Sequence, residues 1–102
     1  MRQEEIALSK AWVYILRCVD GSYYTGQKVN LERRLAEHQM GEGGEWTRHR
    51  LPVVLVFSQE MPDADSAFFA ERQIKNWNRA WKIKRIEQMN PNWRDLYDDL
   101  SI

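Results

Sequence analysis

Five side chains in this sequence have the types that chemistry on a phosphodiester would use. They are two aromatic hydroxyls, a guanidinium, an imidazole and a carboxylate: Tyr14, Tyr24, Arg34, His38 and Glu71. Hydrolysis of a phosphodiester needs an activated water, a cation over the phosphate and stabilisation of the leaving oxygen. The five groups would supply these functions if the fold brings them together.

Each of these residues alone is more often structural than catalytic. Tyrosines on strands usually lie in the core, and helical arginines and glutamates usually face solvent. Arg34 and Glu71, however, border apolar stripes, where an unpaired charge is costly. Each therefore needs a partner, a metal ion or an anionic ligand. Other chemistries lack their motifs, because the sequence has no Gly-x-Ser-x-Gly, no P-loop and no Cys/His cluster with zinc spacing.

Two strands joined by a turn are expected to position the tyrosines. Residues 11–18 form a near-continuous apolar run, and residues 22–26 form the return strand, which Gly26 is expected to end. Asp20-Gly21 between them predicts a type I′ turn. Side chains alternate along a strand, so the two faces of the first strand are predicted to carry Trp12, Tyr14, Leu16 and Cys18 on one side and Val13, Ile15 and Arg17 on the other. Tyr14 is expected to pair with Tyr24.

A helix over residues 31–39, capped by Asn30, is expected to position the arginine and the histidine. At about 100° per residue, Arg34 lies beside an apolar stripe and next to the histidine four residues on. That stripe consists of Leu31, Leu35 and His38.

The second half of the chain is expected to supply a third strand and three helices. A glycine-rich loop over residues 41–50, expected to be mobile, precedes an apolar strand over 53–58. Helices are predicted over 66–77 after a cap at Asp63 or Asp65, over 79–89 after a cap at Asn78, and over 92–100 as a docking helix. In the first of these helices Glu71 lies at the edge of an apolar stripe formed by Ala67, Ala70, Ile74 and Trp77.

The order of these elements, β-β-α-β-α-α, predicts an α/β (α+β) fold with a small, mostly antiparallel three-stranded sheet flanked by helices. The 102 residues fit a single domain over 1–102 with a core over about 11–89. The single cysteine, Cys18, excludes a disulfide framework. Residues 3–10 are expected to form a short amphipathic turn or helix, and the first residues lack the apolar core of a signal peptide. No apolar run approaches the ~18 residues that span a bilayer, so a cytoplasmic protein without membrane contact is expected.

The ordered set of segments resembles the GIY-YIG nuclease superfamily, and most closely its small stand-alone bacterial members. Residues 12–14, Trp-Val-Tyr, stand where the family has Gly-Ile-Tyr, and residues 24–26, Tyr-Thr-Gly, stand where it has Tyr-Ile-Gly. Residues 31–38 resemble the family's helix, and residues 69–75 resemble its metal-carboxylate helix. The similarity runs from about residue 11 to residue 97.

The resemblance implies a metal-dependent DNA endonuclease and a role for each of the five residues. Tyr14 would be the general base or would orient the attacking water, with help from His38 because a tyrosine pKa is ordinarily near 10. Tyr24 would hold the phosphate or a metal-bound water, and Arg34 would contact the non-bridging phosphate oxygens. Glu71 would bind one weakly held Mg²⁺ (or Mn²⁺) ion that stabilises the departing 3′ oxygen. No organic cofactor is implied.

The formal net charge is zero, which argues against an indiscriminate nucleic-acid binder. Contacts to DNA are therefore expected from a local set of basic residues that bind phosphates: Lys28, Arg33, Arg48, Arg50 and Lys75. Phosphate contacts position DNA without reading its sequence. The first hypothesis is thus a structure-selective endonuclease acting on branched, nicked or single-stranded DNA, with a link to repair or recombination.

Two alternatives stay open at the level of the sequence. The same fold would serve as a catalytically weak or inactive module that binds nucleic acid or protein, which the zero net charge favours. A protein-interaction domain would instead use a tryptophan-rich surface formed by Trp77, Trp81 and Trp93, although these residues have core spacing. Association with DNA without turnover in Mg²⁺ or Mn²⁺ would favour the binding module.

Overall fold

An antiparallel sheet of three strands in the order β2-β1-β3 forms the centre of the fold. The computed structural model describes residues 10–101, so the short turn or helix expected over 3–10 lies almost wholly outside the described residues. The strands are β1 (Ala11–Arg17), β2 (Tyr23–Lys28) and β3 (Val54–Met61). The helices are α2 (Leu31–Gln39), α3 (Glu45–Arg48), α4 (Ala64–Lys75), α5 (Arg79–Met89) and the 3₁₀ helix η1 (Leu96–Ser101).

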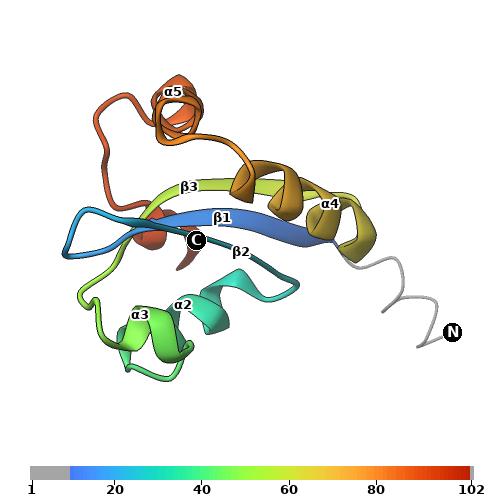
Figure 1. Cartoon of the computed structure of the whole chain (residues 1–102). Coiled ribbons are helices and arrows are strands. Elements are labelled where there is room, and N and C mark those ends of the chain that lie inside the picture. The colour runs from blue at the N-terminus through green and yellow to red at the C-terminus, as the bar shows by residue number, and fades with distance from the viewer. Residues whose placement is uncertain (1–9, 102) are drawn as a thin grey trace, which may run out of the picture.

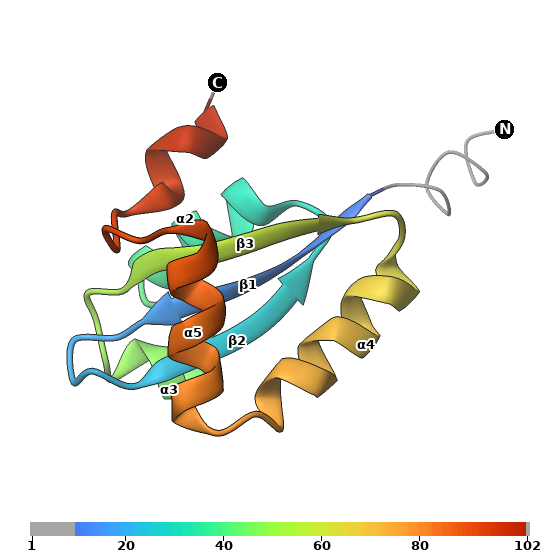
Figure 2. The same cartoon turned by 90° about the horizontal axis from the view of Figure 1, so that it is seen from above.

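The sheet separates two groups of helices (Figure 1). α2 and α3 lie on one side of it, and α4 and α5 lie on the other (Figures 1 and 2). The predicted α+β class and the order β-β-α-β-α-α are therefore confirmed, and none of the helices within residues 10–101 is long and apolar enough to cross a bilayer. Predicted caps begin three of the helices. Asn30, Asp63 and Asn78 each accept a hydrogen bond from a backbone N–H three residues ahead.

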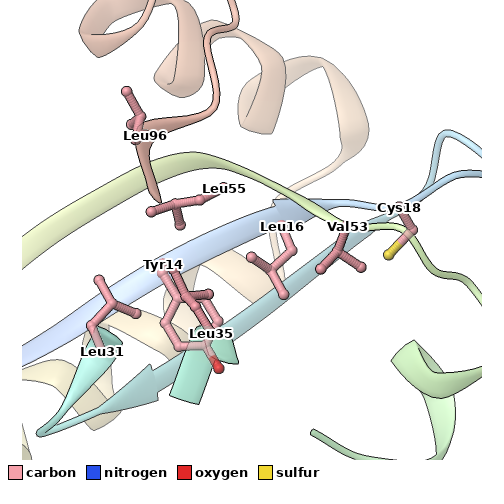
Figure 3. Packing of buried hydrophobic residues seen from close by; sticks show 8 residues of the cluster. All are labelled: Tyr14, Leu16, Cys18, Leu31, Leu35, Val53, Leu55 and Leu96. Carbon is pink, nitrogen blue, oxygen red and sulfur yellow. The ribbon is translucent and has the colours of Figure 1, made fainter. Parts of the chain in front are cut away.

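Alternation along β1 divides the core into two apolar clusters. Tyr14, Leu16 and Cys18 face α2 and η1, and Figure 3 shows them with Leu31, Leu35 and Leu96 around them. Val13 and Ile15 face the opposite side. There they join Val56, Phe57, Ile74 and Ile86 from β3, α4 and α5. The predicted faces of β1 are thus confirmed, and His38 is fully buried on the Tyr14 side of the sheet.

The hairpin between β1 and β2 differs from the type I′ prediction. Gly21 has a positive φ of 84°, but Asp20 does not, whereas a type I′ turn needs both. The N–H of Gly21 donates to the carbonyl of Cys18, and that of Cys18 donates to the carbonyl of Ser22. This is the three-residue hairpin in which a turn is followed by a left-handed residue. β2 also runs past Gly26 to Lys28, so this glycine does not end the strand.

Two other predictions for the chain ends and loops are wrong. The loop expected over 41–50 contains the short helix α3, which packs Thr47 into the interior. The helix expected over 92–100 is the 3₁₀ helix η1, because Trp93 has a φ of 54° that a right-handed helix excludes. Trp93 consequently packs on the cluster of Val13 and Ile15, while Leu96 packs on the cluster of Tyr14.

Asn90 ends α5 and ties it to the sheet. Its side-chain amide donates to the carbonyls of Val56 and Arg94, and its side-chain oxygen accepts from the N–H of Arg94. The residue is buried, so these bonds satisfy polar atoms that would be costly to leave unpaired. Trp81 on the same helix is 55% exposed, in contrast to the core contact predicted for it.

Candidate active site

A chain of hydrogen bonds starts at Tyr14 and runs into the helix and the loop beneath the sheet. Tyr14 Oη lies 3.2 Å from His38 Nε2, and His38 Nδ1 lies 3.0 Å from Thr47 Oγ1. The Thr47 hydroxyl donates to the carbonyl of Gly44, so its oxygen is free to accept from Nδ1–H. Nε2 is then the acceptor for the Tyr14 hydroxyl. This direction of the bonds leaves the Tyr14 oxygen as an acceptor, toward the neighbouring Arg34 and toward a water molecule.

Tyr24 packs against both Tyr14 and His38. Its ring centroid is 6.4 Å from that of Tyr14 and 5.2 Å from that of His38. The two tyrosines share one face of the sheet but are not directly paired, because Tyr14 lies opposite Gly26 and Tyr24 lies opposite Leu16. They are diagonal neighbours, within reach of aromatic side chains. The expectation that Tyr14 pairs with Tyr24 is corrected in this way.

Arg34 is held over the site by the loop that follows α2. Its Nη2 donates to the carbonyl of Gly43 at 2.7 Å, and its Nη1 donates to Glu37 Oε1 at 3.2 Å. The side chain is 23% exposed, so part of the guanidinium stays accessible to an anion. It also lies close enough to Tyr14 to act on the pKa of that hydroxyl. Arg34 and His38 are therefore both brought to Tyr14, as the helical spacing predicts.

Glu71 reaches the site from α4, which packs against β1 and β2 (Figure 2). Its side chain is 15% exposed and lies 3.6 Å from Lys75 Nζ. Its negative charge contributes to raising the pKa of Tyr14, which places the two groups in one electrostatic environment. Glu71 is thus within electrostatic range of Tyr14, although α4 lies on the side of the sheet opposite α2.

The pKa of Tyr14 is raised to about 12. Burial of the hydroxyl is the main cause, and Tyr24 adds to it, whereas Arg34 acts in the opposite direction. The hydroxyl therefore keeps its proton at neutral pH. A hydroxyl that keeps its proton is suited to holding and orienting a water molecule, and is less suited to taking a proton from it.

The pKa of His38 is lowered to about 4, because burial and the positive charge of Arg34 both oppose protonation. His38 is neutral in the folded protein at pH values where an unfolded histidine, with a pKa near 6.5, takes up a proton. The unfolded state then binds more protons, so stability falls as pH is lowered from about 6.5 to about 4.

We expect this single group to remove about 3 kcal/mol of unfolding free energy over that range. Urea denaturation between pH 4 and pH 7.5 measures it. His38→Gln should flatten the slope that this residue contributes, and His49→Gln should keep it, because His49 is exposed at the end of α3. Equal slopes in the two variants would contradict the assignment.

Gly26 lies against the ring of Tyr14. A Cβ at this position would lie 2.5 Å from the Tyr14 hydroxyl oxygen and 2.6 Å from Cζ, which is closer than side chains tolerate. The glycine therefore serves close approach inside β2, and it holds Tyr14 against His38.

Gly26→Ala should push Tyr14 off His38. We expect a loss of about 1–3 kcal/mol in stability from overpacking and about a hundredfold loss of any activity from the displaced hydroxyl. Thermal unfolding and a rate measurement check the two effects. Lys28→Ala, on the same face of β2 but exposed, should leave the stability within about 0.5 kcal/mol. A Gly26→Ala protein with unchanged stability would show that Tyr14 is not confined.

The predicted phosphate-binding residues divide into two groups. Lys28 and Arg33 border, with Arg34, a hollow of about 360 Å³ at the start of α2, and Lys75 lies beside Glu71. Arg48 and Arg50 are instead engaged on α3 and the hairpin. Arg48 pairs with Glu45 at 2.8 Å, and Arg50 pairs with Asp20 at 3.1 Å. Lys28, Arg33 and Lys75 therefore border this hollow or lie beside Glu71. Arg33 and Lys75 also have acidic partners, Glu37 and Glu71, each at 3.6 Å.

Three residues of the loop 41–50 belong to the site although the sequence did not single them out. Thr47 holds His38, Trp46 stacks on Tyr24 with centroids 6.1 Å apart, and Gly43 lies so close to the His38 ring that a Cβ would overlap it. A tryptophan inside a polar, glycine-rich loop was the one available signal, because such a residue needs a surface to pack on. Thr47 and Gly43 carry no pattern of their own.

The comparison with known proteins agrees with this arrangement. Residues 10–84 match the family model described as the GIY-YIG catalytic domain. The chain belongs to the GIY-YIG family. The UPF0213 protein of Streptococcus sanguinis (strain SK36) is 40% identical over 84 residues, covering 82% of this chain and 97% of that protein. The UPF0213 protein of Natronomonas pharaonis is 45% identical over 75 residues, covering 74% and 88%.

A solved structure shares both the sequence similarity and the fold. The solution NMR structure of a UPF0213 protein from Bacillus halodurans has 32% sequence identity and a TM-score of 0.57, and the match covers 84% of this chain and 92% of that one. The resemblance to small stand-alone GIY-YIG proteins is therefore confirmed. GIY-YIG domains are nuclease domains that act on DNA and generally use divalent metal ions.

The carboxylates of the described residues would hold such an ion only together with phosphate oxygens of the substrate. Within residues 10–101, no group of three or more His, Cys, Asp or Glu side chains is arranged to hold a metal. Mg²⁺, however, keeps several waters and is often held by one or two carboxylates together with substrate phosphates. Glu71 is 15% exposed and fits this mode of binding once its ion-pair partner Lys75 turns to a phosphate.

Proposed function

We propose that this GIY-YIG protein is a cytoplasmic, metal-dependent DNA endonuclease in which residues 1–102 form one nuclease domain. The observation that carries the proposal is the 3.2 Å contact between Tyr14 Oη and His38 Nε2, placed where Tyr24, Arg34 and Glu71 also act. A tyrosine with a purely structural role in a hydrophobic core would not need an arginine, a histidine and a carboxylate around it. Phosphodiester hydrolysis uses each of them.

Tyr14 orients the attacking water. Its hydroxyl proton is directed to His38, which leaves a lone pair to accept a hydrogen bond from the water. The raised pKa of Tyr14 and the lowered pKa of His38 both oppose transfer of that proton. Thr47 and Gly43 hold His38 in place, so the hydroxyl is positioned before substrate arrives.

Arg34 and Glu71 act on the negative charge of the scissile phosphate and of the leaving oxygen, respectively. The guanidinium contacts the non-bridging oxygens of the scissile phosphate, for which its planar fork is suited. Glu71 would hold a Mg²⁺ or Mn²⁺ ion together with phosphate oxygens and water, and that ion would stabilise negative charge on the leaving oxygen. Tyr24, which packs against Tyr14 and His38, donates its hydroxyl to the phosphate. Lys28, Arg33 and Lys75 bind neighbouring phosphates.

Phosphate contacts alone do not read sequence, so the enzyme selects DNA by structure. Cleavage of that type is used in DNA repair and recombination. The neutral total charge agrees with a local footprint in place of a broad basic face. Arg48 and Arg50 would contribute only if DNA displaces Glu45 and Asp20 from them.

The test is cleavage of a panel of end-labelled plain, nicked, branched and single-stranded DNAs with Mg²⁺, with Mn²⁺ and with EDTA. We expect product with either metal ion and none with EDTA. A Glu71→Gln preparation purified in the same way controls for contaminating nuclease. DNA that is bound but not cut under all conditions would refute the proposal in favour of a binding module.

A further inference from the structure

A second hollow lies beside the site, at the exposed edge of β2. It has a volume of about 240 Å³ and is lined by residues of four elements: Tyr23, Tyr24, Thr25, Trp46, Lys75 and Lys82. We call it the β2-edge groove. It shares Tyr24 with the candidate active site, and Lys75 lies 3.6 Å from the carboxylate of Glu71. A ligand in the groove would therefore be the immediate neighbour of a phosphate at the site.

One residue that lines the groove, Thr25, carries a buried polar atom without a partner. Thr25 is 3% exposed, and its hydroxyl oxygen makes no hydrogen bond to any residue that the structure describes. It is the only buried side-chain nitrogen or oxygen in residues 10–101 with this property. An unpaired buried hydroxyl costs stability, and such groups in native proteins call for an explanation. A ligand that hydrogen-bonds to it would provide one.

The walls of the groove combine aromatic surface with positive charge. Trp46 is 39% exposed, and it is braced by Tyr24 at 6.1 Å and by the Arg50 guanidinium 4.0 Å from its ring centroid. Tyr23 is braced in the same way by Trp93 and by Arg79. Lys75 and Lys82 complete the rim. Rigid aromatic walls with flanking cations are the surface on which single-stranded nucleic acids bind.

We propose that the β2-edge groove binds one unpaired nucleobase next to the scissile phosphate. The base packs against the exposed part of Trp46 at the edge of β2, the Thr25 hydroxyl hydrogen-bonds to its edge, and Lys75 and Lys82 bind the flanking phosphate. A phosphate alone would use the lysines but would have no need of the aromatic walls. A base within a duplex has both faces covered by its neighbours, so only a base outside the stack can enter.

The proposed function then acquires a defined substrate class: DNA in which the nucleotide beside the cleaved bond is unpaired. The inference rests on the proposed function only for the position of the cleaved bond. Binding itself is measured in EDTA, where no cleavage occurs.

The experiment compares a fluorescently labelled single-stranded oligonucleotide with the same strand in a duplex. We expect wild-type protein to prefer the single strand. Trp46→Ala should weaken single-strand binding about tenfold to a hundredfold and leave duplex binding nearly unchanged. Trp46→Phe should restore much of the loss. Trp81→Ala, which removes an exposed tryptophan of α5 outside the groove, should bind like wild type.

Thr25→Val gives a readout that a purely structural role would not give. Because it removes an unpartnered buried hydroxyl, we expect the Tm to rise by about 4 °C. Single-strand binding should nevertheless weaken by about threefold to tenfold, because the base loses its hydrogen bond. A variant that is more stable and yet binds more weakly marks the hydroxyl as a ligand contact.

An abasic position, moved along the single strand, locates the base. With Mg²⁺ present, cleavage should drop most when the abasic position adjoins the cut. The proposal is overturned if Trp46→Ala weakens single-strand and duplex binding equally, or if abasic and intact strands bind alike. Cleavage without a Trp46-dependent preference would refute the groove and keep the nuclease. A Trp46-dependent preference without any cleavage would support the groove and refute the nuclease.

Discussion

Tyr14→Phe should reduce the rate of DNA cleavage by about a thousandfold and leave the fold intact. The change removes one oxygen, which contacts His38 and which, in the proposed mechanism, accepts a hydrogen bond from the attacking water. Groups that position or activate a nucleophile contribute about 10²–10⁴ in rate. Single-turnover kinetics with saturating enzyme measure the loss, because they exclude effects on product release.

Stability and rate must be separated in this variant. Tyr14→Phe leaves His38 Nε2 without its partner in the interior, so we expect a cost of about 1–2 kcal/mol in unfolding free energy. Tyr97→Phe is the matched control, since Tyr97 packs on the same apolar cluster from η1 and is outside the site. It should keep the wild-type rate. If Tyr14→Phe retains more than a tenth of the rate, the hydroxyl does not act on the water.

Glu71→Gln should lower the rate by a similar factor for a different reason. Glutamine keeps the size of the side chain but has no charge with which to hold a divalent ion. If the ion supplies about 4 kcal/mol of transition-state stabilisation, the loss is about a thousandfold. Raising the Mg²⁺ or Mn²⁺ concentration should recover part of the rate, because a weakened site is filled by mass action.

Recovery with metal distinguishes this variant from Tyr14→Phe, which should not respond to added Mg²⁺. Glu60→Gln is the control, because Glu60 is exposed at the end of β3 and pairs with Lys10. DNA binding in EDTA should be unchanged or slightly tighter in Glu71→Gln, since a negative charge near phosphate is removed. A Glu71→Gln protein with wild-type rate at low Mg²⁺ would show that this carboxylate holds no ion.

Local patterns in the sequence determined the elements and their faces. The bounds of α2 and α5, the three caps and the two faces of β1 follow from periodicity and from side chains that bond to a backbone N–H three residues away. These interactions span a few residues, so a single stretch of sequence contains both partners. The similarity to GIY-YIG nucleases rests on the same short segments in the same order.

Only the tertiary structure decided how those segments meet. Three contacts join different elements: Thr47 with His38, Gly43 with the imidazole of His38, and Gly26 with Tyr14. The sequence next to each residue gives no signal that predicts them. The β2-edge groove depends most clearly on the tertiary structure, because its lining residues come from β2, α3, α4 and α5. The sequence by itself determined which side chains could act on a phosphate. Packing over long range decided their distances, their pKa values and the space left beside them, since these depend on burial and on neighbours from distant parts of the chain.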